Sequence, residues 1–434
     1  MTVPLLLALQ LAAQDTSRLT LADAVQRALA SQPGVAAARE SRASAQANVG
    51  VARAPLWPRL SASLSANQYK IGNLVYPLSG INPANPPLFA TTLSQGALQL
   101  GYTLFDFGGR TSQVRLAKAE ERRAEAALDA TSAATISRTV SAYLRVLTTR
   151  GVLDAQERRL AALRSEADRV AQLEAQGKAA HVEVLRLAAE VSRARADEVA
   201  TRAQLDVAEH DLGRLVNLPA DTVRVLRPVR LADTTLEGRA ALIATAEQNS
   251  PEVAQAEREA EAAQAGVGVA QASLLPQLSA TAVYVENGHQ FTGYRPWWNA
   301  GLQLSYPIFT GGSRSSAVRA NQAAARAAGA QLDAARQGAE QSVDAAVATL
   351  ASASATVQAL STAVAQSEEV ERIRLLSLQV GSGTETDYLD AEATLLSNRA
   401  SLVQAQNDEI AARVELARVT GELSPAWMAR VLAQ

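Results

Sequence analysis

The sequence predicts an α+β membrane protein, in which β-strands contributed by several copies of the chain close a barrel and long helices form coiled coils. Three observations lead to this prediction. The chain is an internal tandem duplication, each half holds two strands of alternating polarity, and each half continues into a proline-free helix of roughly 65 residues.

Composition and charge exclude several classes of protein. The chain has 434 residues, a formal net charge of −2 and no cysteine. A nearly neutral chain carries no electrostatic footprint for nucleic acid, so no nucleic-acid partner is expected. Without cysteine there are no disulfides, no thiolate metal ligands and no attachment point for a bacterial lipid anchor. Alanine dominates the apolar residues, which suits closely packed helices better than a thick globular core.

The duplication is visible in landmark residues that recur along the chain. The matching pairs are Pro33 with Pro251, Pro58 with Pro276, Gly108 with Gly311, and Gly177 with Gly381. The offset is 218 residues for both proline pairs but 203 and 204 for the glycine pairs. The second half is therefore shorter between its proline and glycine landmarks, as expected of a surface loop, whereas the helical interval keeps its length.

The N-terminal residues have the character of a signal peptide. The apolar run from Val3 to Ala13 is too short to span a bilayer and ends in small residues. The basic region expected before it is missing, which either argues against a signal peptide or indicates a truncated start; the alternative is a frayed apolar N-terminus. We expect a signal peptide over 1–14, a first repeat over 15–233 and a second repeat over 234–434. No later stretch approaches 18 uninterrupted apolar residues, so any membrane-spanning part is expected to be a β-barrel.

Each repeat is expected to open with helices and to end in a long helical hairpin. Thr20 and Asp23 resemble a capping box at the first helix. The long helices are predicted over about 109–176, 181–215, 313–379 and 386–420. Apolar residues recur every seven positions at Val343, Leu350 and Val357, which indicates left-handed coiled coils. The strand-to-helix turns are expected at Gly108, Gly109, Gly311 and Gly312.

Four segments alternate strictly in polarity. The strands are predicted over about 58–68, 96–107, 276–286 and 297–309. Leu60, Ala62 and Leu64, for example, alternate with serines. Strands of about ten residues have the length that a tilted membrane barrel requires. The loops between paired strands are expected over Tyr69–Ser94 and Asn287–Arg295.

Aromatic residues gather in these strand segments, with seven in Trp57–Phe107 and seven in Tyr284–Phe309. Such crowding is typical of the aromatic girdles at membrane interfaces. We expect Trp57, Phe105, Phe107, Tyr306 and Phe309 at one interface and Trp297 and Trp298 near the other. A soluble hairpin pair packed on helices would also alternate and also contain aromatics. The scarcity of charge on the apolar faces favours the membrane.

The number of strands predicts an oligomer. Four strands are too few to close a barrel that conducts solutes, and an open sheet cannot lie in lipid with bare edges. The strands at the edges of the sheet must therefore pair with strands from other copies of the chain.

The segment VGSGTETDYLDAE, over Val380–Glu392, together with the duplication and the Gly-Gly turns, resembles the TolC-like outer-membrane efflux proteins. The resemblance covers nearly the whole chain. It implies a homotrimer with a twelve-stranded barrel, four strands per subunit, in the lipid of a Gram-negative outer membrane. A long α-helical coiled-coil barrel would continue it across the periplasm. The implied function is the passive exit duct of a tripartite export system, with a periplasmic adaptor and an inner-membrane pump as partners and no cofactor.

The resemblance also implies roles for residues at the helical tips. Asp387 and Asp390 correspond to an acidic ring that narrows the periplasmic entrance, and Glu183 holds the matching place in the first repeat. The alternative is that these are ordinary solvated acids at helix starts. The tips are expected to dock the adaptor; they comprise Gly177, Lys178, Gly381, Ser382, Gly383 and Thr384. Some family members latch the entrance with a Tyr and an Arg where this chain has Leu378 and Gly383, so that latch is absent.

Two other functions fit the sequence less well. Catalysis is not expected, because His181, His210 and His289 are scattered and no nucleophile, phosphate loop or metal-ligand cluster can be assembled from the spacing. A soluble periplasmic coiled-coil adaptor would share the helical hairpins, but it would not explain the four alternating strands. The exported substrate (a drug, a metal ion or a protein) is not specified by the sequence.

Overall fold

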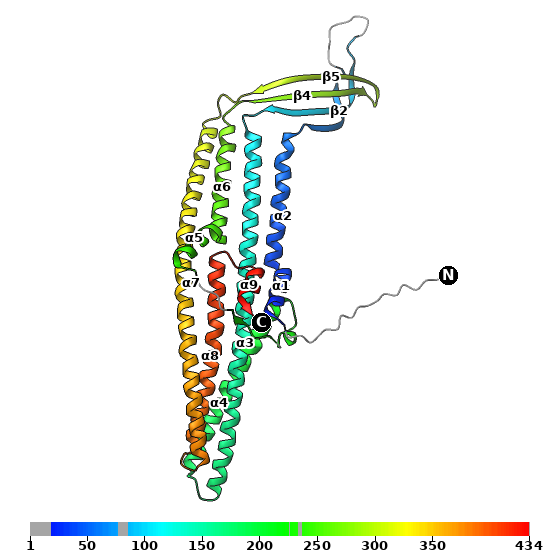
Figure 1. The fold of residues 1–434 in the computed structure, drawn as a ribbon. Helices are drawn as coiled ribbons and strands as arrows, with labels where there is room; N and C mark the ends of the chain where they lie inside the picture. The colour runs from blue at the N-terminus through cyan, green and yellow to red at the C-terminus, as the bar shows by residue number, and fades with distance from the viewer. Residues whose placement is uncertain (1–18, 77–85, 225, 233–236, 434) are drawn as a thin grey trace, which may run out of the picture. The chain divides into compact units, whose positions relative to one another are not determined.

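The computed structural model describes residues 19–76, 86–224, 226–232 and 237–433. The element order α1 α2 β1 β2 α3 α4 recurs as α5 α6 β4 β5 α7 α8, so the duplication extends to the fold (Figure 1). The predicted fold class, with long helices and four strands per subunit, is confirmed. The expected signal peptide, 1–14, lies outside the described residues.

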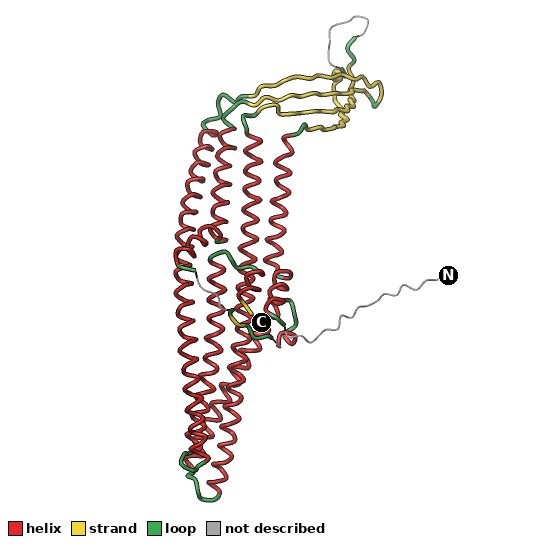
Figure 2. Tube along the Cα trace, in the orientation of Figure 1, coloured by secondary structure: helices red, strands yellow, loops and turns green. Residues whose placement is uncertain are grey.

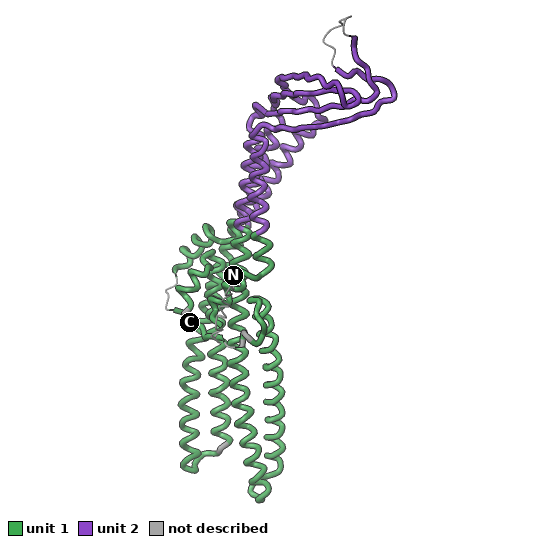
Figure 3. Tube along the Cα trace, turned by 90° about the vertical axis from the view of Figure 1, so that its right-hand side faces the viewer, with its two compact units in different colours: residues 1–39, 127–254, 335–434 green, residues 40–126, 255–334 purple. Residues whose placement is uncertain are grey.

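The chain divides into two compact units (Figure 3). One unit holds residues 40–126 and 255–334, which include all four long strands. The other unit holds 1–39, 127–254 and 335–434, which include the helical hairpins. The boundary falls within helices, so α2, α3, α6 and α7 each contribute to both units.

The strand unit contains one antiparallel sheet in the order β1-β2-β4-β5, drawn in yellow in Figure 2. The strands are β1 (Arg59–Leu74), β2 (Phe89–Phe105), β4 (Gln277–His289) and β5 (Thr292–Ser305). Both predicted loops were too long. β1 continues through an irregularity between Gln68 and Asn73, and β4 and β5 are joined by Gln290 and Phe291 alone. Both of these turn residues have positive φ, as a tight hairpin turn requires. At its other end β5 stops at Ser305, earlier than predicted.

The strand register gives the sheet one apolar and one polar face. Leu60, Leu100, Ala282 and Ala300 lie opposite one another in a row across the four strands. The next row holds Ser61, Gln99, Val283 and Asn299. Successive strand residues point to opposite faces, so the alternation predicted from the sequence becomes an amphipathic sheet.

Four long helices form two hairpins: α3 (Gly109–Ala175) with α4 (His181–Val216), and α7 (Ser313–Gln379) with α8 (Glu385–Val419). Heptad residues Val343 and Leu350 are buried, as a coiled-coil seam requires. In the described chain, α7 also contains an 18-residue window with mean hydropathy 1.3, which meets the length and composition of a membrane span. Only 6% of that window is buried within the subunit. Length and composition of this kind are also those of an alanine-rich coiled-coil helix.

The remaining elements are shorter than these four helices. They are α1 (Leu21–Ser31), α2 (Pro33–Arg53), η1 (Ala54–Leu56), η2 (Ala220–Arg224), β3 (Arg230–Leu231), α5 (Arg239–Asn249), α6 (Pro251–Ala272), α9 (Pro425–Val431) and β6 (Leu432–Ala433). Thr20 caps α1, since its side chain accepts a hydrogen bond from the Asp23 N–H at 3.1 Å. The two-residue strands β3 and β6 pair, which ties the connection between the repeats to the C-terminus.

The core of the hairpin unit includes Tyr143 of α3, which is fully buried. Its hydroxyl oxygen lies 2.8 Å from the carbonyl oxygens of Leu19 and Arg227 and accepts a hydrogen bond from the Arg227 N–H at 2.9 Å. Burial raises the pKa of Tyr143 well above its usual value, so the hydroxyl keeps its proton and can donate. Tyr143 thereby holds two segments against α3: the one that precedes α1, at Leu19, and the one that follows η2, at Arg227.

Candidate functional site: helical tips and amphipathic sheet

The first tip is a tight glycine turn between α3 and α4. Gly177 has φ +69°, a conformation that favours glycine. Its N–H donates to the Glu174 carbonyl oxygen, and the Lys178 N–H donates to the Leu173 carbonyl oxygen, both at 2.8 Å. These bonds satisfy the last carbonyls of α3. α4 then begins after Ala180, which provides no side-chain cap.

The second tip has the same turn but a better capped helix. Gly381 has φ +75°, and the N–H groups of Ser382 and Gly383 both donate to the Ser377 carbonyl oxygen, at 2.9 and 3.0 Å. Thr384 caps α8 through a hydrogen bond from the Asp387 N–H at 3.2 Å. A Cβ added at Gly383 would lie 2.9 Å from Ser377 Cβ. This crowding gives a local reason for glycine at this position.

The two aspartates of the second tip share one face and one groove. Asp387 and Asp390 line a groove of about 410 Å³ between α7 and α8. Arg374 lines it as well, with its Nη1 atom 4.0 Å from Asp387 Oδ2. Within the described chain, the Asp390 carboxylate has no ion pair. Asp390 therefore keeps its charge uncompensated, whereas the charge of Asp387 is partly offset.

Arg374 was missed by the sequence reasoning. A signal was present, because Arg374 precedes Gly381 by seven residues and Asp387 follows it by six. Residues at similar distances from a hairpin turn lie side by side on its two helices, so a basic residue there could have been recognised as a partner for the acid.

Glu183 of the first tip has a different environment. Its Oε2 atom lies 3.8 Å from Arg186 Nε, and Arg186 also lies 3.9 Å from Glu190. With the offset of the tip glycines, Arg186 occupies the place that Asp390 holds in the second repeat. The structure thus places a cation beside Glu183, and the two tips differ in net charge.

Six of the seven predicted interface aromatics are exposed. They are Trp57, Phe105, Phe107, Trp298, Tyr306 and Phe309, with exposed fractions from 48% to 89%. Trp297 differs from these six, because it is partly buried and lies opposite Val285 on the polar face. Its place near a membrane interface stays a prediction. Adjacent residues of a strand point to opposite faces, so Trp297 and Trp298 cannot both contact lipid.

The first strand-to-helix turn has specific contacts. Gly108 has φ +86°, and Asp106 Oδ2 accepts hydrogen bonds from the Arg110 backbone N–H at 2.7 Å and from its Nε at 3.1 Å. In the second repeat Gly311 and Gly312 both have positive φ. The predicted glycines therefore lie where the backbone turns from strand to helix.

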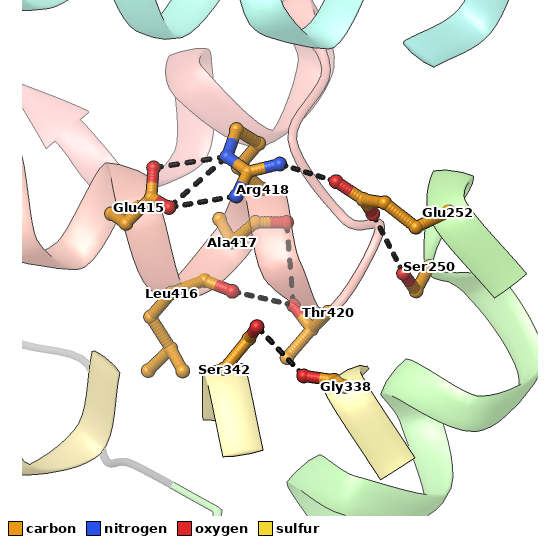
Figure 4. A network of polar contacts seen from close by, with 9 residues as sticks. All are labelled: Ser250, Glu252, Gly338, Ser342, Glu415, Leu416, Ala417, Arg418 and Thr420. Carbon is orange, nitrogen blue, oxygen red and sulfur yellow. Dashed lines mark hydrogen bonds and ion pairs between the residues drawn. The ribbon is translucent and has the colours of Figure 1, made fainter. Parts of the chain in front are cut away.

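The C-terminal end of α8 is fixed by a polar network (Figure 4). Arg418 donates to Glu415, with distances of 2.8 to 3.1 Å, and to Glu252 at 2.7 Å; Ser250 also donates to Glu252. Burial would raise the pKa of Glu252, but the hydrogen bonds from Arg418 and Ser250 outweigh it and lower the pKa. The network joins α8 to the start of α6, within the hairpin unit.

The described chain thus combines a sheet that is apolar on one face and polar on the other with long helical hairpins. The chain matches the family described as Outer membrane efflux protein over residues 24–218 and 242–422, and it belongs to this family. It is an outer-membrane efflux protein, and the adaptor interpretation is not supported.

Two relatives and one solved structure illustrate the similarity. The chain is 27% identical to Protein CyaE of Bordetella pertussis, over 88% of this chain and 79% of that protein. It is 24% identical to outer membrane protein TolC of Escherichia coli, over 92% and 81%. The structure of outer membrane protein VceC from Vibrio cholerae superposes with a TM-score of 0.76 at 22% identity, over 92% and 96% of the chains. This last similarity shows a shared fold.

Proposed function

We propose that three copies of this chain form the passive exit duct of a tripartite export system, with twelve strands in one barrel. The observation that supports this most directly is the open sheet. In the described chain, β1 and β5 each have a strand partner on one side only. Bare strand edges are not tolerated in lipid, so other copies must supply the missing pairings.

The oligomer is tested by fractionation. We expect the protein in outer-membrane fractions as a trimer that resists detergent at room temperature and dissociates on heating. Recovery as a monomer without detergent would contradict the proposal and would fit a soluble adaptor instead.

The acids of the second tip would form the entrance of the duct. In a trimer, Asp387 and Asp390 contribute up to six carboxylates to one constriction, which raises cation occupancy and impedes anions. The position of Arg374 refines this proposal, because Asp390 would carry more of the effect than Asp387. Glu183, beside Arg186, would contribute less.

The two tips would dock the periplasmic adaptor. A Cβ at Gly177 or Gly381 meets no atom within 4 Å, so these turns present open surface. We expect the Gly177→Trp/Gly381→Trp variant to lose export while its trimer still assembles. The matched Gly177→Ala/Gly381→Ala variant imposes the same backbone strain without the bulk, and it should still export. Normal export by the tryptophan variant would argue against docking at the tips.

A further inference from the structure

Carboxylates are absent from the polar face of the sheet. The segment Arg59–Phe105 contains no Asp or Glu, and Gln277–Ser305 contains only Glu286. Glu286 lies opposite Gly96 and Pro296, on the same face as Tyr284, whose hydroxyl donates to Glu286 Oε1 at 3.0 Å. The single acid of the four strands is therefore on the apolar face.

Two arginines lie on the polar face. Arg59 is opposite Gly101, close to the helices, and Arg295 is opposite Asn287, close to the β4–β5 turn. In the described residues, neither guanidinium has a carboxylate partner. The face that would line a pore thus carries positive charge without a compensating acid.

The Arg295 side chain packs against Tyr76. Its guanidinium carbon lies 4.9 Å from the centroid of the Tyr76 ring, and the Tyr76 hydroxyl donates to the Gly293 carbonyl oxygen. Gly293 has φ +61°, and a Cβ there would lie 2.9 Å from His289 Cε1, so the turn beneath the tyrosine is closely packed. A cation–π contact uses the flat face of the guanidinium, which leaves its N–H donors directed away from the ring.

A second donor lies beside this arginine. The indole Nε1 of Trp297 is buried and has no hydrogen-bond partner among the described residues. Trp297 follows Arg295 by two residues and lies on the same face. Indole nitrogen can only donate, so neither side chain offers an acceptor.

We propose that Arg295, supported by Tyr76, forms an anion-binding site on the polar face of the sheet, specific for the carboxylate or phosphate groups of solutes that leave the duct. A guanidinium binds such oxyanions through two parallel hydrogen bonds. The inference rests on the proposed function, because three such sites form a ring only in a trimer whose polar face lines the pore. The exit would then be positively charged, whereas the tip of the second hairpin is acidic.

Block of single channels by citrate tests the proposal. The purified trimer is placed in bilayers of uncharged phosphatidylcholine, and citrate is added to each side in turn. We expect citrate to block from the side of the β4–β5 turn. The Arg295→Gln variant should raise the half-blocking concentration about tenfold or more, since a hydrogen bond to a charged group contributes about 1.5–3 kcal/mol. Tyr76→Leu should raise it about two- to fivefold, because the cation–π support is lost, and Tyr76→Phe, which keeps the ring, should raise it less than Tyr76→Leu.

Matched variants separate the possible outcomes. Glu286→Gln, on the apolar face, and Arg59→Gln, at the other end of the polar face, should not change block from the turn side. Block that is absent in the wild type, or unchanged by Arg295→Gln, would overturn the anion site. An Arg295→Gln variant that weakens only the binding of lipopolysaccharide would also overturn it, since the arginine would then face lipid. Failure to form any conducting trimer would refute the proposed duct itself, whereas a conducting trimer with unaltered citrate block would refute this inference alone.

Discussion

The two helical hairpins have the same backbone conformation at their turns but differ in the chemistry of their side chains. Gly177 and Gly381 have nearly the same φ, and each turn joins a long helix to the antiparallel helix that follows it. The residues around these turns diverge, because Asp390 stands where the first repeat has Arg186. Duplication has preserved what the turn requires and has left the charge of each tip free to change.

A second difference lies further from the turns. In α7, Val370, Ile373 and Leu376 are about half exposed, whereas the matching positions 166 and 169 of α3 hold Glu166 and Arg169, which form an ion pair at 2.6 Å. Thus the second hairpin combines an exposed apolar row with acids, and the first hairpin pairs its charges internally. In the proposed duct, we therefore expect the two hairpins to contribute differently to the entrance.

The largest expected effect concerns the ends of the returning helices. Asn217 and Gly421 correspond in the two repeats, and both have positive φ. A Cβ at Gly421 would lie 2.0 Å from the Asn249 carbonyl oxygen. We expect Gly421→Asn to destabilise the subunit by roughly 3 kcal/mol or more, because backbone must move, although asparagine is tolerated in the first repeat. The unfolding temperature measures this. The reciprocal Asn217→Gly should change stability little. If the two substitutions lowered stability equally, the proposed difference between the repeats would be contradicted.

A smaller effect is expected at the starts of these helices. Thr384 caps α8, whereas Ala180 leaves α4 uncapped. Thr384→Ala should cost about 1 kcal/mol of local stability, which would speed hydrogen exchange of the Asp387 amide about fivefold. Ala180→Thr should slow exchange at the Glu183 amide. Exchange that is indifferent to both substitutions would mean that capping does not distinguish the tips.

The smallest effect is expected in the network of Arg418. The Glu252 carboxylate is about half exposed, so solvent screens the pair, and Arg418→Gln should cost less than about 1 kcal/mol. The pKa of Glu252 is lowered from 4.5 in the folded state, so its contribution is present above pH 4.5 and is lost as the pH falls through the folded pKa. The stability difference between wild type and variant should therefore shrink on acidification. A difference that is constant from neutral to acid pH would contradict this account of the network.

The fold could be predicted because its signals are periodic. Alternation in segments such as Leu60–Ala66 and heptads such as Val343 and Leu350 specify an amphipathic sheet and coiled-coil helices without knowledge of tertiary contacts. The extent of β1 could not be predicted, since the irregularity between Gln68 and Asn73 interrupts the alternation.

Long-range contacts were beyond the sequence. No local sequence pattern predicts that Tyr143 contacts the carbonyl oxygens of two residues far away in the sequence, or that β6 pairs with β3. At the site, the aspartates of the second tip followed from the motif, but the position of Arg374 depends on how α7 packs against α8. The orientation of Trp297 could have been predicted, because successive residues of a strand point to opposite faces and Trp297 therefore lies on the other face from Trp298.

Ion selectivity of single channels tests the central claim, that the second hairpin carries the acidic entrance of an outer-membrane duct. Reversal potentials in a KCl gradient should show a cation-selective wild type. This preference should disappear in Asp387→Asn/Asp390→Asn, should fall more in Asp390→Asn than in Asp387→Asn, and should barely change in Glu183→Gln. The reason is that Arg374 lies near Asp387 and Arg186 near Glu183, whereas Asp390 is uncompensated within the described chain. Selectivity that is unchanged in the double variant, with the trimer intact, would contradict the claim and would show that both acids face solvent outside the pore.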